Sequence, residues 1–577
     1  MKNFTFLILF LFSNTVFATT YYVDAEAQGT NSGTSWANAF TNLQMAINAS
    51  NDGDQIFVKA GTYFPSQQMI SGDPRSRAFY ITKNIKIYGG FNGTETTIAE
   101  RNFNTNITIL SGDFNGNDTD TNGNGINDFG QGENAYSVVV AYGLNNTALI
   151  DGFKIFGGNA DGTTQYLLGT NEVKTANGGG IHNVNSNLVV RNTKFNNNSA
   201  SFGGGIANKG ECFPKIEFCD FTYNFASYGS SIQLNNASLA TINNCSFTSN
   251  RGSGVLMSMN NSVVKVSNST FSYNQGTSGG VMYNNNYCNA VFMNCILNNN
   301  TASSSGGAFY STSYSIVTLY NTLVYKNFAV YGGAVYNVSN SYTNSINSTF
   351  YGNNASTKGG AFYCSVSPDN MFMKLYNTII YGNTSPSNPN WFKEYYTSSN
   401  IHVKNSIFQG SGGSNSWNTF YGTNDGNNLD VNPLFTNTNE GTEDFKLQAS
   451  SPGINASYNQ LLNLPNGNNS WTATDLDVYG NSRLVGSGVD IGAAEAQSNL
   501  NVENPLSRKI SVFYDNSYLY FNNASALTNQ TVTVYAINGS QVYKGILINE
   551  IIRLPDLSKG IYIVKVNDNN GIKFIVD

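Results

Sequence analysis

One pattern of polar and apolar positions recurs along the chain between residues 192 and 405. Each copy has an Asn, two residues, an apolar residue, two more residues and usually a second Asn. Successive copies lie 24 to 30 residues apart. A repeat of this size is one supersecondary unit that buries its apolar face only against its neighbours, so the pattern predicts a solenoid. The apolar position holds Phe195, Phe221, Phe247, Phe271, Leu297, Val324, Phe350, Ile380 and Phe408.

Each repeat reads as one rung of three short strands. In one rung a Gly-Gly corner leads into a segment that contains Phe309 and Tyr310, a second strand follows at Ile316 to Leu319, and a third at Thr322 to Val324. Side chains alternate along a strand, so Tyr310 should face outward if Phe309 faces inward. Rungs stack about 4.8 Å apart, which places equivalent residues of successive rungs in contact. We therefore predict contacts by comparing equivalent positions of successive rungs, which form columns along the coil.

Two columns lie at the corner before the third strand: the corner position itself and the position that follows it. The corner needs a residue that tolerates left-handed backbone, which Asn does; it is held by Asn192, Asn244, Asn268, Asn294, Asn321, Asn347, Asn377 and Asn405. The next position is always small, which favours buried packing for the cysteines in it; it holds Thr193, Cys219, Cys245, Ser269, Cys295, Thr322, Ser348, Thr378 and Ser406. The alternative is a disulfide or metal site built from Cys212 with Cys219 and Cys288 with Cys295.

The composition excludes some classes of protein. The chain has 577 residues, 57 Gly and only 11 Pro, which is typical of many short strands joined by tight turns. Charged residues make up 11% and aromatic residues 13%. The net charge is −6 and basic residues do not cluster, so nothing indicates a nucleic-acid partner.

The first 18 residues have the pattern of a secretory signal peptide. Lys2 precedes an apolar stretch from Phe4 to Phe12, and Val16-Phe17-Ala18 fits a cleavage site. The apolar stretch is too short to span a bilayer. We therefore expect export through the periplasm to the outer-membrane surface or the extracellular space.

The array from about residue 50 to 495 resembles the right-handed parallel β-helix family, the pectate-lyase-like fold. Trp36 to Phe40 and Gly53 to Tyr63 look like the start of exported bacterial β-helix proteins, in which a short helix caps the open end. Asn432 to Phe435, Ser451 to Ile454 and Asp490 to Glu495 are similar to the closing module called choice-of-anchor Q. The resemblance implies an all-β fold: a three-stranded parallel β-helix followed by a small C-terminal β-sandwich.

After residue 497 the repeat stops and a different pattern begins. Alternating segments flank an Asn538-Gly539 turn, which is a strong hairpin signal. With Asn504-Pro505 and Gly560-Ile561-Tyr562, this tail resembles the C-terminal sorting domain of the type IX secretion system, which implies that machinery as a partner. We divide the chain into a signal peptide (1–18), a cap with first rungs (19–150) and an Asn/Asp/Gly-rich insertion near 111–134, regular rungs (151–410), a closing module (411–497) and a sorting domain (498–577).

Polysaccharide cleavage is the usual enzymatic reading of such a fold, and it requires carboxylates. Glycosidases place two of them about 5 to 10 Å apart. From residue 178 to 383 the acidic residues are Glu211, Glu217, Asp220 and Asp369. The central rungs therefore offer no carboxylate pair.

A charged quartet remains at the N-terminal side of the regular rungs. Column alignment places Arg191 beside Glu217 and Lys194 beside Asp220, all facing outward. As a catalytic site, Arg191 or Lys194 would neutralise charge and His182 would act as the base. The alternative, which we favour, is a pair of surface ion pairs between rungs.

The insertion contains a candidate calcium loop. From Asp120 it reads D-x-N-x-N-G-x-x-D, the alternating oxygen ligands and Gly turn of a calcium site, although Gln131 holds the place of the terminal Glu. An insertion without a ligand is the alternative. The candidate ligands are Asp118, Asp120, Asn122, Asn124 and Asp128.

The last candidate is a column of tyrosines on the outward side of the Gly-Gly strand, formed by Tyr283, Tyr310, Tyr336 and Tyr363. Such a flat amphipathic ledge suits sugar rings or a protein partner, whereas stacking between rungs alone would only stabilise the coil. The sequence thus predicts a non-catalytic adhesin or glycan-binding protein whose ligand is a glycan or a host or cell-surface molecule; the alternative is a polysaccharide lyase or glycoside hydrolase.

Overall fold

The computed structural model describes residues 18–128, 130–365, 373–394, 401–458, 464, 470–472, 474–497, 511–515, 517–522, 530–547, 551–566 and 571–576. The predicted signal peptide and the Asn504-Pro505 mark lie outside these residues, except for Ala18. Within the described part, no helix is long and apolar enough to cross a membrane.

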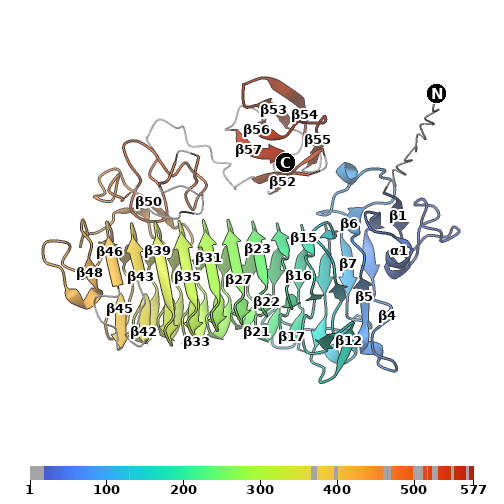
Figure 1. Ribbon diagram of the computed structural model, residues 1–577, viewed down its shortest axis with the longest axis horizontal. Helices are drawn as coiled ribbons and strands as arrows, with labels where there is room; N and C mark the ends of the chain where they lie inside the picture. Colours follow the sequence, from blue (N-terminus) through green and yellow to red (C-terminus); the bar gives the residue numbers. More distant parts are fainter. Residues whose placement is uncertain are drawn as a thin grey trace, which may run out of the picture.

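The chain folds into a right-handed parallel β-helix followed by a small β-rich domain, as predicted (Figure 1). The three predicted strands of each rung form three long sheets, parallel except for the pair β4 and β5, and the structure adds a fourth, shorter sheet. Along the chain each rung visits sheet 1, the Asn corner, sheet 2, sheet 3, the Gly corner and sheet 4.

Sheet 1 consists of β1 (Thr20–Val23), β2 (Gln55–Lys59), β6 (Lys86–Phe91), β9 (Leu149–Asp151), β15 (Val189–Arg191), β19 (Lys215–Glu217), β23 (Leu239–Asn243), β27 (Val263–Ser267), β31 (Asn289–Met293), β35 (Ile316–Tyr320), β39 (Tyr342–Ile346), β43 (Met373–Tyr376), β46 (Ile401–Lys404) and β48 (Thr423–Asn424). Sheet 2 consists of β3 (Gly61–Tyr63), β7 (Thr108–Ser111), β10 (Lys154–Phe156), β16 (Lys194–Asn196), β20 (Asp220–Thr222), β24 (Ser246–Thr248), β28 (Thr270–Ser272), β32 (Ile296–Asn298), β36 (Leu323–Tyr325), β40 (Thr349–Tyr351), β44 (Ile379–Tyr381) and β47 (Ile407–Phe408).

Sheet 3 consists of β11 (Asn159–Ala160), β17 (Ser199–Phe202), β21 (Phe225–Tyr228), β25 (Arg251–Ser253), β29 (Gln275–Ser278), β33 (Thr301–Ser305), β37 (Phe328–Tyr331) and β41 (Asn354–Lys358). Sheet 4 consists of β4 (Gln67–Gln68), β5 (Arg77–Ile81), β8 (Val139–Tyr142), β14 (Ile181–Val184), β18 (Ile206–Lys209), β22 (Ile232–Asn235), β26 (Leu256–Met259), β30 (Met282–Asn285), β34 (Phe309–Thr312), β38 (Val335–Val338), β42 (Phe362–Ser365) and β45 (Trp391–Glu394).

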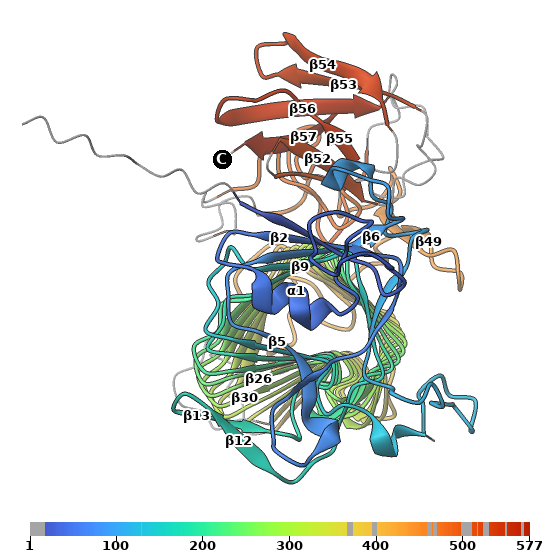
Figure 2. The ribbon, with the colours of Figure 1, turned by 90° about the vertical axis from the view of Figure 1, so that its right-hand side faces the viewer.

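Both ends of the coil are covered. At the N-terminal end α1 (Leu43–Ala49) lies over the opening, and its Leu43, Ala46 and Ile47 join the main core (Figure 2). At the other end η5 (Thr419–Tyr421) contributes Phe420 and Tyr421 against the same core. The described residues also contain the 3-10 turns η1 (Pro74–Ser76), η2 (Ile98–Glu100) and η3 (Gln131–Glu133).

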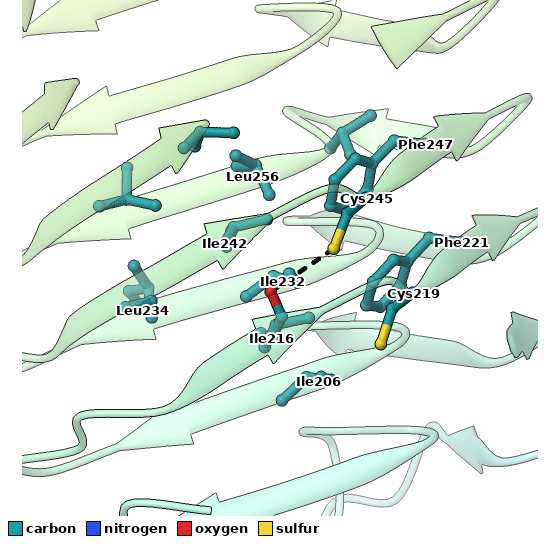
Figure 3. Close-up of a cluster of buried hydrophobic side chains, with 14 of the residues drawn as sticks. Ile206, Ile216, Cys219, Phe221, Ile232, Leu234, Ile242, Cys245, Phe247 and Leu256 are labelled. Carbon is teal, nitrogen blue, oxygen red and sulfur yellow. Dashed lines mark hydrogen bonds between the residues drawn. The ribbon is translucent and has the colours of Figure 1, made fainter. Parts of the chain in front are cut away.

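The predicted apolar column is the centre of the core. All nine residues are fully buried, and so is Phe309, whereas Tyr310 is half-exposed, which confirms the predicted alternation. The Phe rings stack almost parallel along the coil; the ring centroids of Phe221 and Phe247 lie 4.8 Å apart. Figure 3 shows these rings beside the inward Ile and Leu side chains of sheets 1 and 4.

A second, buried Asn column links successive rungs. Each Oδ1 accepts both the backbone N–H and the Nδ2 of the preceding Asn at 2.9 to 3.1 Å. Each Nδ2 also donates to a carbonyl of the stacked apolar column, as Asn250 does to Phe221 at 2.9 Å. The column satisfies buried backbone groups at every bend. It comprises Asn198, Asn224, Asn250, Asn274, Asn300, Asn327, Asn353 and Asn383.

The predicted corner asparagines all adopt left-handed backbone, with φ between 46° and 53°. The small residues beside them are buried, and their hydroxyls and thiols lie against carbonyls of the chain, as Cys219 Sγ does against Glu217 at 3.3 Å. All six cysteines are free and buried. The cysteines are therefore packed in the interior as predicted, and the alternative disulfides do not form.

After β48, the described residues between 432 and 497 lie against the outside of the coil. The hairpin β49 (Phe435–Asn437) and β50 (Asp444–Leu447) packs its aromatic residues on the outer face of sheet 2. The corner column anchors the rest: Asn377 exchanges two hydrogen bonds with the backbone of Tyr458, at 2.7 and 2.8 Å. Asn347 accepts a hydrogen bond from the indole of Trp471 at 2.8 Å.

The C-terminal domain has two antiparallel sheets that share one core. The first consists of β51 (Ser511–Asp515), β52 (Tyr518–Asn522) and β55 (Ile551–Arg553). The second consists of β54 (Gln541–Ile546), β53 (Thr531–Ala536), β56 (Gly560–Val566) and β57 (Ile572–Val576). The predicted Asn538-Gly539 turn joins β53 and β54.

The stacked Phe column should dominate the stability of the coil. Phe247→Ala removes a fully buried ring with two stacked neighbours, so we expect a loss of about 3 to 5 kcal/mol in the free energy of unfolding. Thr248→Ala, outward on the same strand, and Tyr310→Ala should both cost less. Urea denaturation followed by circular dichroism measures all three; an equal loss for Thr248→Ala would contradict the inward assignment of Phe247.

Candidate functional site

The four predicted tyrosines form one continuous ladder on the outer face of sheet 4. Strands β30, β34, β38 and β42 pair in parallel, with Tyr283 opposite Tyr310, Tyr310 opposite Tyr336 and Tyr336 opposite Tyr363. The preceding residue of each strand is buried in the core. The alternation of the strands therefore directs every tyrosine outward.

The rings stack face to face along the coil axis. Centroid separations are 5.1, 5.5 and 4.7 Å from Tyr283 to Tyr363, and the planes differ by 17°, 3° and 10°. Each inner ring thus has both faces against a neighbouring ring. What the ladder presents to solvent is a strip of ring edges and hydroxyls.

The Gly corner makes room for the ladder. At Gly254 a Cβ would lie 3.0 Å from the Cβ of Tyr283, and at Gly332 it would lie 3.2 Å from that of Tyr363. Both glycines have positive φ, near 69° and 65°. The Gly corner therefore serves both the backbone bend and the space that the rings need.

Burial affects the chemistry of the hydroxyls. Desolvation raises the pKa of Tyr283 and Tyr310 above the ordinary value; Tyr310 and Tyr228 add to the effect at Tyr283, and Tyr336 adds to it at Tyr310. These two hydroxyls therefore stay protonated at neutral pH. Each can donate one hydrogen bond and accept others.

Sequence reasoning missed two aromatic residues that contact the ladder and two in the turns that follow its strands. Tyr228 and Tyr331, the last residues of their strands in sheet 3, meet Tyr283 and Tyr363 edge to face at 5.6 Å. Tyr287 and Tyr314 stack at 5.0 Å in the turns that follow β30 and β34, and they are 55% and 50% exposed. Two features of the sequence could have identified them. Tyr228 and Tyr331 directly precede the Gly corner, and Tyr287 and Tyr314 are one rung spacing apart in equivalent turns.

The ladder column continues toward the N-terminus to one of the catalytic candidates. Register places Met257 next to Tyr283, then Gln233, Ala207 and finally His182. His182 therefore shares the column of the tyrosines, which sequence reasoning did not foresee.

His182 is nevertheless withdrawn from solvent. It is 1% exposed because the hairpin β12 (Gln165–Leu168) and β13 (Asn171–Lys174) packs over this end of sheet 4. Burial, with a contribution from Lys209, lowers the pKa of His182 to about 3. The imidazole is neutral at pH 7 and has no open path to a polymeric substrate.

The other two catalytic candidates lie on different sheets. Arg191 lies on sheet 1 and forms the predicted ion pair with Glu217, Nη2 to Oε2 3.1 Å. Lys194 follows the corner and lies on sheet 2, opposite Asp220 in the register. Because His182, Arg191 and Lys194 belong to three sheets that face three directions, the structure does not bring them together.

The calcium candidates lie in the insertion, and their carboxylates already have partners. Asp128 accepts hydrogen bonds from Thr121 N and Oγ1, at 2.9 and 2.6 Å, and from Asn122. Asp120 accepts from the backbone of Asn124 at 3.2 Å and from that of Gly125.

Asp118 stands apart from these two. It accepts from Asn134 and Asn127, and burial raises its pKa to about 6. Among the described residues, no group of three or more His, Cys, Asp or Glu is arranged to hold a metal ion. Calcium binding by this loop stays a prediction.

Two families match parts of the chain. Residues 139–295 match the right handed beta helix region, and residues 504–577 match the secretion system C-terminal sorting domain. No curated protein matches the chain significantly. Among solved structures, the crystal structure of pectate lyase Pel9A aligns with 83% of this chain and 96% of that chain, at 14% identity and a TM-score of 0.37.

The two matches coincide with the two bodies of the structure. The match to the right handed beta helix region covers rungs of the coil. The match to the sorting domain covers the antiparallel domain that begins at β51. A C-terminal sorting domain marks a protein for the type IX machinery and so for the cell surface or the surrounding medium. The chain is thus a type IX-sorted, exported protein whose central body is a right-handed parallel β-helix.

Proposed function

We propose that the protein is a non-catalytic glycan-binding adhesin whose binding surface is the tyrosine ladder on sheet 4. The observation that supports this most is the register of Tyr283, Tyr310, Tyr336 and Tyr363, four aromatic hydroxyls on successive rungs at one strand spacing. Stability of the coil alone does not require a hydroxyl on each ring.

The stacking geometry defines how a ligand would bind. Because the ring faces pack against one another, a sugar would contact ring edges and the row of hydroxyls instead of lying flat on a ring. A row of donors and acceptors repeated at about 4.8 Å suits an extended polymer with its own regular hydroxyls. The exposed rings of Tyr287 and Tyr314 offer apolar surface beside it.

Binding is favoured over cleavage by the composition of the same rungs. From Phe221 to Pro368 the chain contains no Asp or Glu. General acid and nucleophile in glycoside hydrolysis are paired carboxylates. The rungs from Phe221 to Pro368 can therefore hold a glycan, but they give the ladder no paired carboxylates to cleave it.

Export would begin with removal of the predicted signal peptide after Ala18 and continue through the type IX machinery. A chain lacking residues 500–577 should fold its β-helix, since the two bodies have separate cores, and should remain in the periplasm. Cell fractionation and protease accessibility on whole cells measure this. Efficient surface delivery of the truncated chain would show that the tail is not the sorting signal.

Changing Tyr310 and Tyr336 together to Ser should weaken glycan binding while the circular-dichroism spectrum stays nearly unchanged. Central aromatic residues of a binding surface cost about 2 kcal/mol or more each when truncated, so we expect a loss of at least about 30-fold in affinity. A glycan array identifies the ligand, and titration calorimetry measures the affinity. The double change to Phe separates the hydroxyls from the rings and should give a smaller loss.

Tyr273→Ser is the matched control, because Tyr273 is 59% exposed on another corner of the coil. It should leave binding unchanged. If the double Ser variant lowers the melting temperature and binds as wild type does, the ladder only stabilises the coil. Release of unsaturated or reducing sugar ends by the wild-type protein would instead favour the enzymatic alternative.

We also propose that the insertion binds calcium, supported by the alternating oxygen ligands at Asp120, Asn122, Asn124 and Asp128. An ion that binds only the folded state raises the melting temperature. Asp120→Ala with Asp128→Ala should abolish any rise seen for wild type in millimolar calcium, with magnesium as the control ion. No response of the wild type to calcium would leave the segment as an insertion without a ligand.

A further inference from the structure

The Asn corner column is interrupted once. Between Asn192 and Asn244, the rung at the same corner carries Phe218, which adopts the same left-handed backbone with φ 54°. Left-handed backbone suits Asn and is a genuine outlier for a bulky residue. Tyr223 and Tyr273 adopt the same backbone at a different corner, so what distinguishes Phe218 is its place in the Asn column.

Phe218 contacts the C-terminal domain. Its ring stacks on that of Phe513 in β51, with centroids 5.1 Å apart and planes at 23°. The guanidinium of Arg191 lies 4.1 Å from the centroid of the same Phe513 ring. Glu217 holds Arg191 in place through hydrogen bonds to Nε and Nη2, at 3.3 and 3.1 Å.

The surface that the domain presents here is apolar and lies opposite its own core. Leu519 and Phe521 of β52 belong to that core, so Tyr520 between them points the other way. Tyr520 stacks on Phe513 at 4.4 Å and lies opposite Ile551 in the register. Tyr520 and Ile551 are only 6% and 4% exposed although both lie outside the domain core.

The coil completes the burial of this face at a second place. Strand β55, which carries Ile551, contacts η2 of the β-helix. In both ribbon views the β52 side of the C-terminal domain lies nearest the coil, over sheet 1 (Figures 1 and 2). The contact therefore involves an aromatic stack, a cation–π pair and a neighbouring turn.

We propose that the β-helix carries a built docking surface for its own sorting domain, centred on Phe218 and Arg191 and occupied by the outer face of the β51–β52–β55 sheet. The Arg191–Glu217 pair, half of the quartet examined for catalysis, is thereby part of this interface, because Glu217 orients the arginine that covers Phe513. While docked, the domain leaves Ile546 and Ile575 of its four-stranded sheet exposed, at 56% and 54%. Recognition of the docked chain would use that sheet.

Replacing Phe218 with Asn tests the proposal, because Asn is the residue that the column uses elsewhere and should relieve backbone strain in the coil. In the full chain we expect faster amide hydrogen exchange in residues 511–522, by up to about tenfold, since one aromatic pair is lost. Small-angle scattering should show a larger radius of gyration. The melting temperature of the β-helix should not fall.

Asn244→Ala is the matched control, one rung further along the same column. It perturbs a corner without touching Phe513 and should leave exchange in residues 511–522 unchanged. Phe513→Ser removes the ring from the opposite side and should reproduce the larger radius of gyration, even if Phe218→Asn folds poorly. Unchanged exchange and scattering in Phe218→Asn, or unchanged scattering in Phe513→Ser, would overturn the docking surface.

Discussion

The register between rungs depends on the buried asparagine column that begins at Asn198. Each side chain accepts from the Asn backbone of the rung before it and donates to the carbonyl of the apolar residue in that same preceding rung, so neighbouring rungs cannot slip without leaving several buried polar groups unpaired. A shift of one residue would also turn every inward side chain outward. The column therefore makes every other column of this protein possible.

The outer columns use that fixed register for different purposes. On sheet 4 it brings four tyrosine rings into contact, although their positions in the chain are 26 or 27 residues apart. At the Asn corner the same register produces a line of side chains that hold the folded-back segment, as Asn377 does with Tyr458. Where one rung substitutes Phe218, the line changes from a polar anchor into an aromatic contact.

Burial separates the residues that can act from those that cannot. His182 lies in the ladder column, yet a hairpin inserted between β11 and β14 covers it and keeps it neutral. The tyrosines lie four to seven rungs further along the same column; Tyr283, Tyr310 and Tyr336 are partly exposed there, whereas Tyr363, at the end of the ladder, is buried. The outer face of sheet 4 is thus divided by an insertion into a closed part and an open part.

The sequence by itself determined the coil, the inward and outward phase of its strands, the tyrosine column, the pair of Arg191 with Glu217 and the separate tail. All of these follow from a period of about 26 residues, because equivalent positions of successive rungs must touch. Only the tertiary structure decided that Tyr228 and Tyr331 meet the ladder, that Trp471 binds Asn347 and that Phe513 lies on Phe218. Contacts of the last two kinds join segments more than 100 residues apart that share no period, so nothing in the repeat encodes which surfaces will meet. They depend on how the segments C-terminal to the coil pack on its exposed corners and faces.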